Sequence, residues 1–150
     1  MGHIIDSEEN KRKYSTEKIT EKICLFIHLL VGSGAMAGGL AAITDPHNPM
    51  GANAAEMLKY SPFSNFLIPG LLLFCVIGLG NIFAALSFLR NWKLRAFISG
   101  FFASALILWI FVQCVMLQGV VVLHIIFIII GVIQGFLALI LICKRIAREM

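Results

Sequence analysis

Four apolar runs, each long enough to cross a lipid bilayer, occupy most of this 150-residue chain. A membrane-crossing helix needs about 20 consecutive apolar residues. The runs cover residues 23–44, 62–89, 96–117 and 120–142. Charged residues make up only 13% of the chain, whereas soluble proteins carry about 25%. The sequence therefore predicts an all-α, integral membrane four-helix bundle that forms a single domain.

The segments outside these runs are short and polar. They are a tail at residues 1–21, links at 45–61 and 90–95, and a second tail at 143–150. The first tail is too long and too acidic for the n-region of a signal peptide, so we expect the first crossing to remain in the mature protein. Gln118 and Gly119 leave only a tight turn, which predicts that the last two crossings form an antiparallel hairpin.

Positive charge is distributed unevenly among these segments. Of the twelve Lys and Arg residues, only Lys59 lies in the 45–61 link; the others lie in the tails, at Lys22 and in the 90–95 link. Basic residues accumulate on the cytoplasmic side of a membrane. We therefore expect both termini to be cytoplasmic, in a multi-pass protein of the cell inner membrane. The basic residues flank apolar runs, so the expected partner is the lipid bilayer and not nucleic acid.

The 45–61 link and the second crossing carry helix signals. Asn53, followed by Glu56, resembles a capping box and predicts a short surface helix through about Tyr60. Ser61-Pro62 is typical of an N-cap followed by proline at the first helical position, which predicts that the second crossing starts there. Pro69-Gly70 lies inside this crossing and predicts a kink or a loosened helix.

Glycines are spaced for close helix contacts in three of the crossings. Gly34 and Gly38 form a G-x-x-x-G pair in the first crossing, Gly78 lies in the second, and Gly131 and Gly135 form another pair in the fourth. Small residues at this spacing let two helix backbones approach closely. Packing within the bundle and homo-oligomerisation are both consistent with the pattern.

Polar residues inside the apolar runs fall at two depths. His28, Asn81 and Gln134 lie nearer the expected cytoplasmic side, where interhelical hydrogen bonds would set the packing. Gln113 and His124 lie nearer the other side, beneath the 45–61 link.

An outer pocket under that link is the ligand-binding hypothesis. The indole N–H of Trp109 needs an acceptor if it is buried, and Gln113 lies one helical turn away. The predicted ligand-binding set is Asp45, His47, Pro69, Trp109, Gln113 and His124.

Catalytic and metal-binding motifs are absent from the sequence. It contains no H-E-x-x-H, G-x-S-x-G or phosphate-binding loop, and none of its four cysteines forms a C-x-x-C pair. We therefore predict no catalytic residues, no metal site and no cofactor.

Three segments of the chain resemble a group of small bacterial four-helix membrane proteins. That group has a D-P-x-G-like link, an S-P-F-x-D-[FY]-L-[IV]-P-G segment and W-x-x-x-Q in the third helix. The corresponding residues here are Asp45-Pro46 with Gly51, Ser61 through Phe74, and Trp109 with Gln113. The chain departs from the pattern at Asn65, where the group has Asp, and at His124 with Ile126, where it has a Q-P pair. The resemblance implies the topology and a bacterial inner membrane, without an activity.

Three functions are consistent with these features. The first is a non-catalytic accessory or self-associating bundle. The second is a small-molecule or lipid-binding protein, or a transporter, with a pocket in the outer half. The third is a membrane enzyme that acts on a lipid-soluble substrate and uses His124 or His47 as acid or base. An outer cavity that reaches Gln113 and His124 would favour the second function, and a solid core would favour the first.

Overall fold

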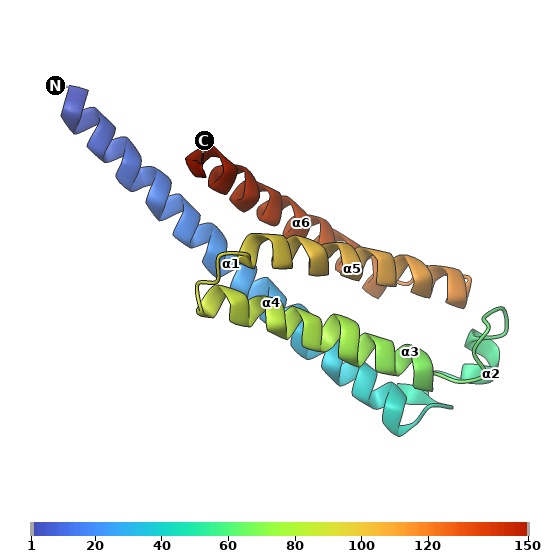
Figure 1. The fold of residues 1–150 in the computed structure, drawn as a ribbon. Helices are drawn as coiled ribbons and strands as arrows, with labels where there is room; N and C mark the ends of the chain where they lie inside the picture. The colour runs from blue at the N-terminus through green and yellow to red at the C-terminus, as the bar shows by residue number, and fades with distance from the viewer. Residues whose placement is uncertain (1, 150) are drawn as a thin grey trace.

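The computed structural model describes the backbone of residues 2–149 and the side chains of residues 14–147, and this part of the chain is helical with no strands (Figure 1). The elements are α1 (Gly2–Thr44), η1 (Pro49–Gly51), α2 (Ala54–Met57), α3 (Leu67–Leu72), η2 (Leu73–Leu79), α4 (Gly80–Leu89), α5 (Arg95–Leu117) and α6 (Val122–Glu149). Four stretches are long and apolar enough to cross a membrane: Tyr14–Thr44, Leu67–Leu89, Arg95–Leu117 and Val122–Ala147. The predicted four-helix membrane bundle is confirmed.

The four crossings alternate in direction, so α1 begins and α6 ends at the same end of the bundle (Figure 1). We call this the terminal end and the opposite end the outer end. α1 packs along α3, η2 and α4, while α5 and α6 form an antiparallel hairpin. Gln118 follows the last residue of α5 and adopts the left-handed conformation, with φ of 49°. A residue in this conformation ends a helix, and here it closes the hairpin.

α1 differs from the prediction at its start. The predicted tail at residues 1–21 is not a separate segment, because α1 runs from Gly2 without a break into the first crossing; residue 1 and the side chains of the first thirteen residues lie outside the described part. Figure 1 shows this start of α1 projecting past the other helices. Once a helix has formed, each added residue costs little, so the crossing can continue into the polar segment.

The second crossing also starts later than predicted. Helix α3 begins at Leu67, with Phe66 at the N-cap position, so the predicted start at Ser61-Pro62 is wrong. Pro69 is the third residue of α3, where the backbone N–H has no partner within the helix in any case. Proline therefore fits without a kink. The α-helical hydrogen bonding of this crossing is interrupted farther along the chain than predicted, in the π-helical segment η2.

The link between the first two crossings folds over the outer end of the bundle. Asn53 Oδ1 accepts a hydrogen bond from Ala55 N at 3.0 Å, and this cap starts α2, which ends at Met57 and not near Tyr60. Leu58 packs in a small apolar cluster with Met116 at the end of α5. The link is thereby attached to the helix hairpin as well as to the crossings that it joins.

Glycines other than the Gly34 and Gly38 pair bring α1 close to its neighbours. A Cβ on Gly39 would lie 2.7 Å from Phe74 N and 2.8 Å from Gly70 O, while one on Gly34 would have nothing within 4 Å. The equivalent position on Gly38 contacts only the Leu73 side chain, at 3.6 Å. Within this chain, the G-x-x-x-G pair therefore does not form the closest helix contact.

The other predicted packing glycines do lie at helix contacts. A Cβ on Gly78 would lie 2.7 Å from the Met36 side chain, and one on Gly131 would lie 2.8 Å from the Ile107 side chain. Gly135 faces Ala103 at the looser distance of 3.9 Å. Gly78 thus lets η2 approach α1, while the fourth-crossing pair lets α6 approach α5.

Candidate functional site

Four helices meet at a cluster of polar side chains buried inside the bundle. It consists of His28 on α1, Asn81 on α4, Ser99 on α5 and Gln134 on α6, and each residue is 0% exposed. Asn81 Oδ1 lies 2.7 Å from His28 Nδ1, and Ser99 Oγ lies 2.7 Å from His28 Nε2. Gln134 Nε2 lies 3.3 Å from Asn81 Oδ1. We call these four residues the buried polar cluster.

One arrangement of protons satisfies these contacts. Asn81 Nδ2 donates to Ile77 O at 2.8 Å, which orients Asn81 Oδ1 toward His28 as an acceptor. His28 Nδ1–H then donates to that oxygen, and neutral His28 Nε2 accepts from the Ser99 hydroxyl. Gln134 Nε2 also donates to Asn81 Oδ1. Gln134 Nε2 and His28 Nδ1 therefore lie 3.1 Å apart because both donate to the same oxygen. This assignment follows from the geometry of the network.

The cluster resembles a catalytic triad only in part. A serine hydroxyl, a histidine and an orienting amide lie in hydrogen-bond order, which is the arrangement that activates a nucleophile. Ser99 is completely buried, however, so no substrate reaches its oxygen in this conformation. What the cluster does is hold four helices in one register. Buried polar groups in a membrane protein are costly unless they are paired in this way.

The sequence placed His28, Asn81 and Gln134 at one depth, and the structure brings them into contact. Ser99 was missed because a serine in an apolar helix usually bonds a carbonyl of its own helix, so its presence carries no signal of an interhelical partner. Gln134 Oε1 has no hydrogen-bond partner in the described part of the chain.

A cavity of about 120 Å³ lies in the outer half of the bundle, and we call it the outer cavity. Its walls come from α1, η2, α5 and α6. The residues that line it are Val31, Gly34, Ala35, Gly38, Leu73, Ile77, Leu106, Trp109, Ile110, Gln113, Leu123, His124 and Phe127. The predicted outer polar residues Trp109, Gln113 and His124 are thus brought together around one space.

The polar groups around the outer cavity include two hydrogen-bond donors. Trp109 Nε1 is buried, and no described residue accepts its hydrogen bond, so the predicted pairing with Gln113 is wrong. His124 Nδ1 accepts from Val121 N at 3.3 Å, which leaves Nε2 as the protonated nitrogen of the neutral ring.

The wall of the outer cavity includes exposed residues on α1 and α6. Gly34 on α1 and Leu123 on α6 line it and are also exposed. Both residues belong to stretches that are long and apolar enough to cross a membrane.

Trp109 also borders a second apolar groove, of about 290 Å³, on the other side of α5. Val76 and Leu108 line that groove, and neither Gln113 nor His124 reaches it. Of these two spaces, only the outer cavity is lined by several polar side chains.

The other members of the predicted ligand-binding set lie away from the outer cavity. Asp45 is exposed, and its Oδ1 accepts from Asn48 N at 3.1 Å in a turn. His47 is exposed in the link, and Pro69 is buried in the first turn of α3. Among the described side chains, no three His, Cys, Asp or Glu residues lie close enough to hold a metal ion.

Comparisons with protein-family models, curated proteins and solved structures found no match for this chain. Its function must therefore be inferred from its own geometry.

Proposed function

We propose that this chain is a non-catalytic membrane protein that binds a small lipid-soluble molecule in the outer cavity. The observation that carries the proposal is an outer cavity whose wall contains Trp109, Gln113 and His124, together with a buried Trp109 N–H that has no acceptor among the described residues. An unpaired buried donor costs about 1–3 kcal/mol. An occupant with an acceptor atom would remove that cost, and lipid tails offer no such atom.

The dimensions and chemistry of the cavity define the occupant. An engineered apolar cavity of about 150 Å³ in another protein binds benzene, so the outer cavity accommodates one ring or a short chain segment. The apolar wall favours a hydrocarbon body, and the Trp109 and His124 donors favour a carbonyl, ether or hydroxyl oxygen on it. The expected ligand class is thus a ring or chain that carries one such oxygen.

The alternatives have less support from the same geometry. A self-associating bundle with a solid core would leave Gly34 and Gly38 on a flat outer face, whereas here both line the cavity. A membrane enzyme needs a nucleophile or carboxylate near His124, and the described hydrogen bond of that ring goes to the backbone of Val121. Binding therefore explains more of the site than association or catalysis does.

Fluorescence of Trp109 tests the proposal directly. The chain has only two tryptophans, so Trp92→Phe leaves Trp109 as the sole emitter. In detergent micelles, para-bromoacetophenone should quench this emission saturably. The control compound para-bromotoluene, which lacks the acceptor oxygen, should require a higher concentration.

A cavity-filling variant provides the matched control. Gly34→Leu should abolish saturable quenching, because its side chain would extend into open space at the cavity wall. Ala37→Leu places the same side chain at an exposed position of α1 and should leave quenching unchanged. Equal, non-saturable quenching by both compounds in all variants would refute the ligand site.

We also propose that the protein resides in a bacterial inner membrane with both termini in the cytoplasm. The uneven distribution of Lys and Arg supports this orientation. With the four cysteines replaced by alanine, Tyr60→Cys should react with a membrane-impermeant maleimide on intact spheroplasts. Leu94→Cys should react only after lysis, although its side chain is also exposed. The reverse pattern of labelling would show the opposite orientation.

A further inference from the structure

Another cavity, of about 390 Å³, lies at the terminal end of the bundle, and we call it the terminal cavity. It is bounded by α1, the loop after α4, the first turn of α5 and the last turns of α6. Lys93, Arg95 and Arg145 contribute positive charge to it, and Glu17 and Glu21 contribute negative charge. None of these residues lines the outer cavity, so the two sites are independent.

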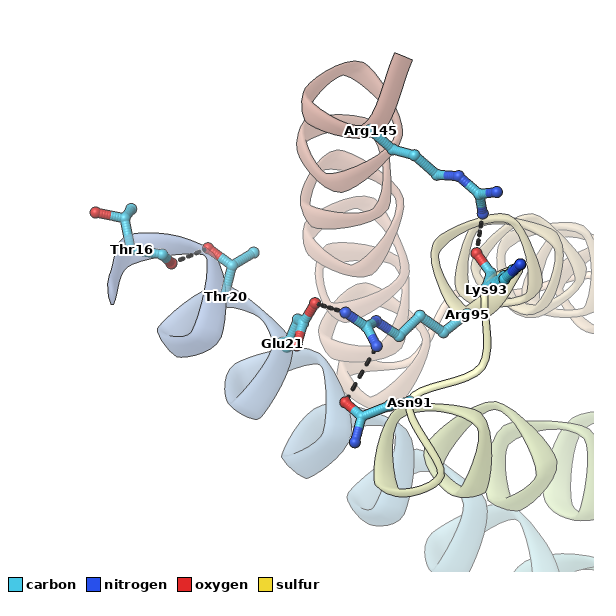
Figure 2. A network of polar contacts seen from close by, with 7 residues as sticks. All are labelled: Thr16, Thr20, Glu21, Asn91, Lys93, Arg95 and Arg145. Atoms are coloured by element: carbon cyan, nitrogen blue, oxygen red, sulfur yellow. Dashed lines mark hydrogen bonds and ion pairs between the residues drawn. The ribbon is translucent and has the colours of Figure 1, made fainter. Parts of the chain in front are cut away.

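A polar network holds the two arginines in place (Figure 2). Arg95 pairs with Glu21 on α1 and donates from Nη1 to Asn91 Oδ1 at 3.1 Å. Arg145 reaches across from α6 and donates to the backbone oxygen of Lys93. A guanidinium has five N–H groups, and Arg95 uses two of them in these contacts. Arg95 therefore keeps donors that can bind a further acceptor.

The surroundings of this network are apolar on the membrane side. Buried Ala96 and Leu141 line the terminal cavity below the charged groups. Trp92 lines it as well, and the Arg145 guanidinium lies 6.0 Å from the centre of the exposed Phe97 ring. A group that combines negative charge with an apolar chain would match both parts of this site.

We propose that the terminal cavity binds the phosphate of a membrane phospholipid. Arginine matches the geometry of a phosphate, with which it forms paired charge-assisted hydrogen bonds. Basic pockets between crossing helices at the membrane edge are suited to phospholipid headgroups. The lining contains three basic residues and two acidic ones, so it is net positive and attracts an anionic group. The acyl chains would extend beside Phe97 into the bilayer.

Native mass spectrometry of the full chain with phosphatidylglycerol tests this proposal. The wild type should retain bound lipid after detergent exchange. Arg145→Gln should weaken binding about fivefold, as expected for one basic charge at a membrane surface. Arg90→Gln removes the same charge from an exposed residue outside the cavity and should change retention little. Equal losses in both variants would indicate general surface attraction and overturn the proposal.

Further controls separate binding from folding and lipid from free phosphate. If Arg145→Gln lowers the thermal stability, Lys93→Gln replaces it, because Lys93 lines the cavity, is exposed and makes no side-chain hydrogen bond or ion pair among the described residues. With Trp109→Phe, the remaining Trp92 lies in the cavity wall. Its emission should shift when phosphatidylglycerol is added to micelles and should not shift with inorganic phosphate. An equal shift with inorganic phosphate would contradict a lipid site.

Discussion

Replacing His28 with leucine should lower the free energy of unfolding by about 2–3 kcal/mol. His28 contacts Asn81 on α4 and Ser99 on α5 from its two ring nitrogens, and all three residues are fully buried. Interhelical hydrogen bonds in membranes contribute about 0.6 kcal/mol on average and up to about 1.7 kcal/mol. The leucine variant loses two of them and leaves the Ser99 hydroxyl without its partner. Unfolding by titration with a denaturing detergent in mixed micelles measures the change.

A double-mutant cycle shows whether the loss comes from the cluster itself. Asn81→Leu alone should also destabilise the bundle, because it leaves His28 Nδ1–H without an acceptor. The double variant His28→Leu with Asn81→Leu should lose less than the two single losses together, since both partners become apolar. Ser104→Ala serves as the control: its exposed hydroxyl bonds Gly100 O in its own helix, so the change should stay within about 0.5 kcal/mol. Additive losses in the cycle would count against a coupled network.

Gly39→Ala should destabilise the protein by about 1–3 kcal/mol through overpacking. The new Cβ would lie 2.7 Å from Phe74 N and 2.8 Å from Gly70 O. Both atoms belong to the backbone, so no side chain can rotate away, and α1 would have to separate from α3 and η2. The same detergent titration measures this effect.

Gly34→Ala is the matched control on the same helix. Its Cβ would have no heavy atom within 4 Å, so only helix propensity changes. Alanine is favoured over glycine in a helix interior by about 0.5–1 kcal/mol, and a small gain in stability is expected. Similar effects from Gly39→Ala and Gly34→Ala would show that α1 does not approach its neighbours through Gly39.

The membrane-spanning architecture could be predicted because each crossing helix corresponds to one long apolar run in the sequence. Helix ends were harder. α1 continues to Gly2 because a polar helix can extend out of the membrane, and Ser61-Pro62 carries a start signal that the chain does not use. Local sequence shows that a cap can form, but tertiary packing of the link determines where the helix begins.

The geometry of the sites depends on how each helix is rotated about its own axis. The spacing of residues along one helix does not specify that rotation. The G-x-x-x-G pattern identified small residues at Gly34 and Gly38, but it could not show that this face borders a cavity while Gly39 meets α3. Depth in the membrane placed His28 beside Asn81, and Trp109 near His124. The contact with Ser99, the unpartnered indole of Trp109 and the terminal cavity each need the relative orientation of two or more helices.

An experimental structure of the protein extracted with its native membrane tests most directly whether the outer cavity holds a lipid-soluble ligand. We expect density inside the cavity, with an acceptor atom within about 3 Å of Trp109 Nε1. A cavity that is closed by neighbouring side chains, with Trp109 Nε1 bonded to Gln113, would contradict it.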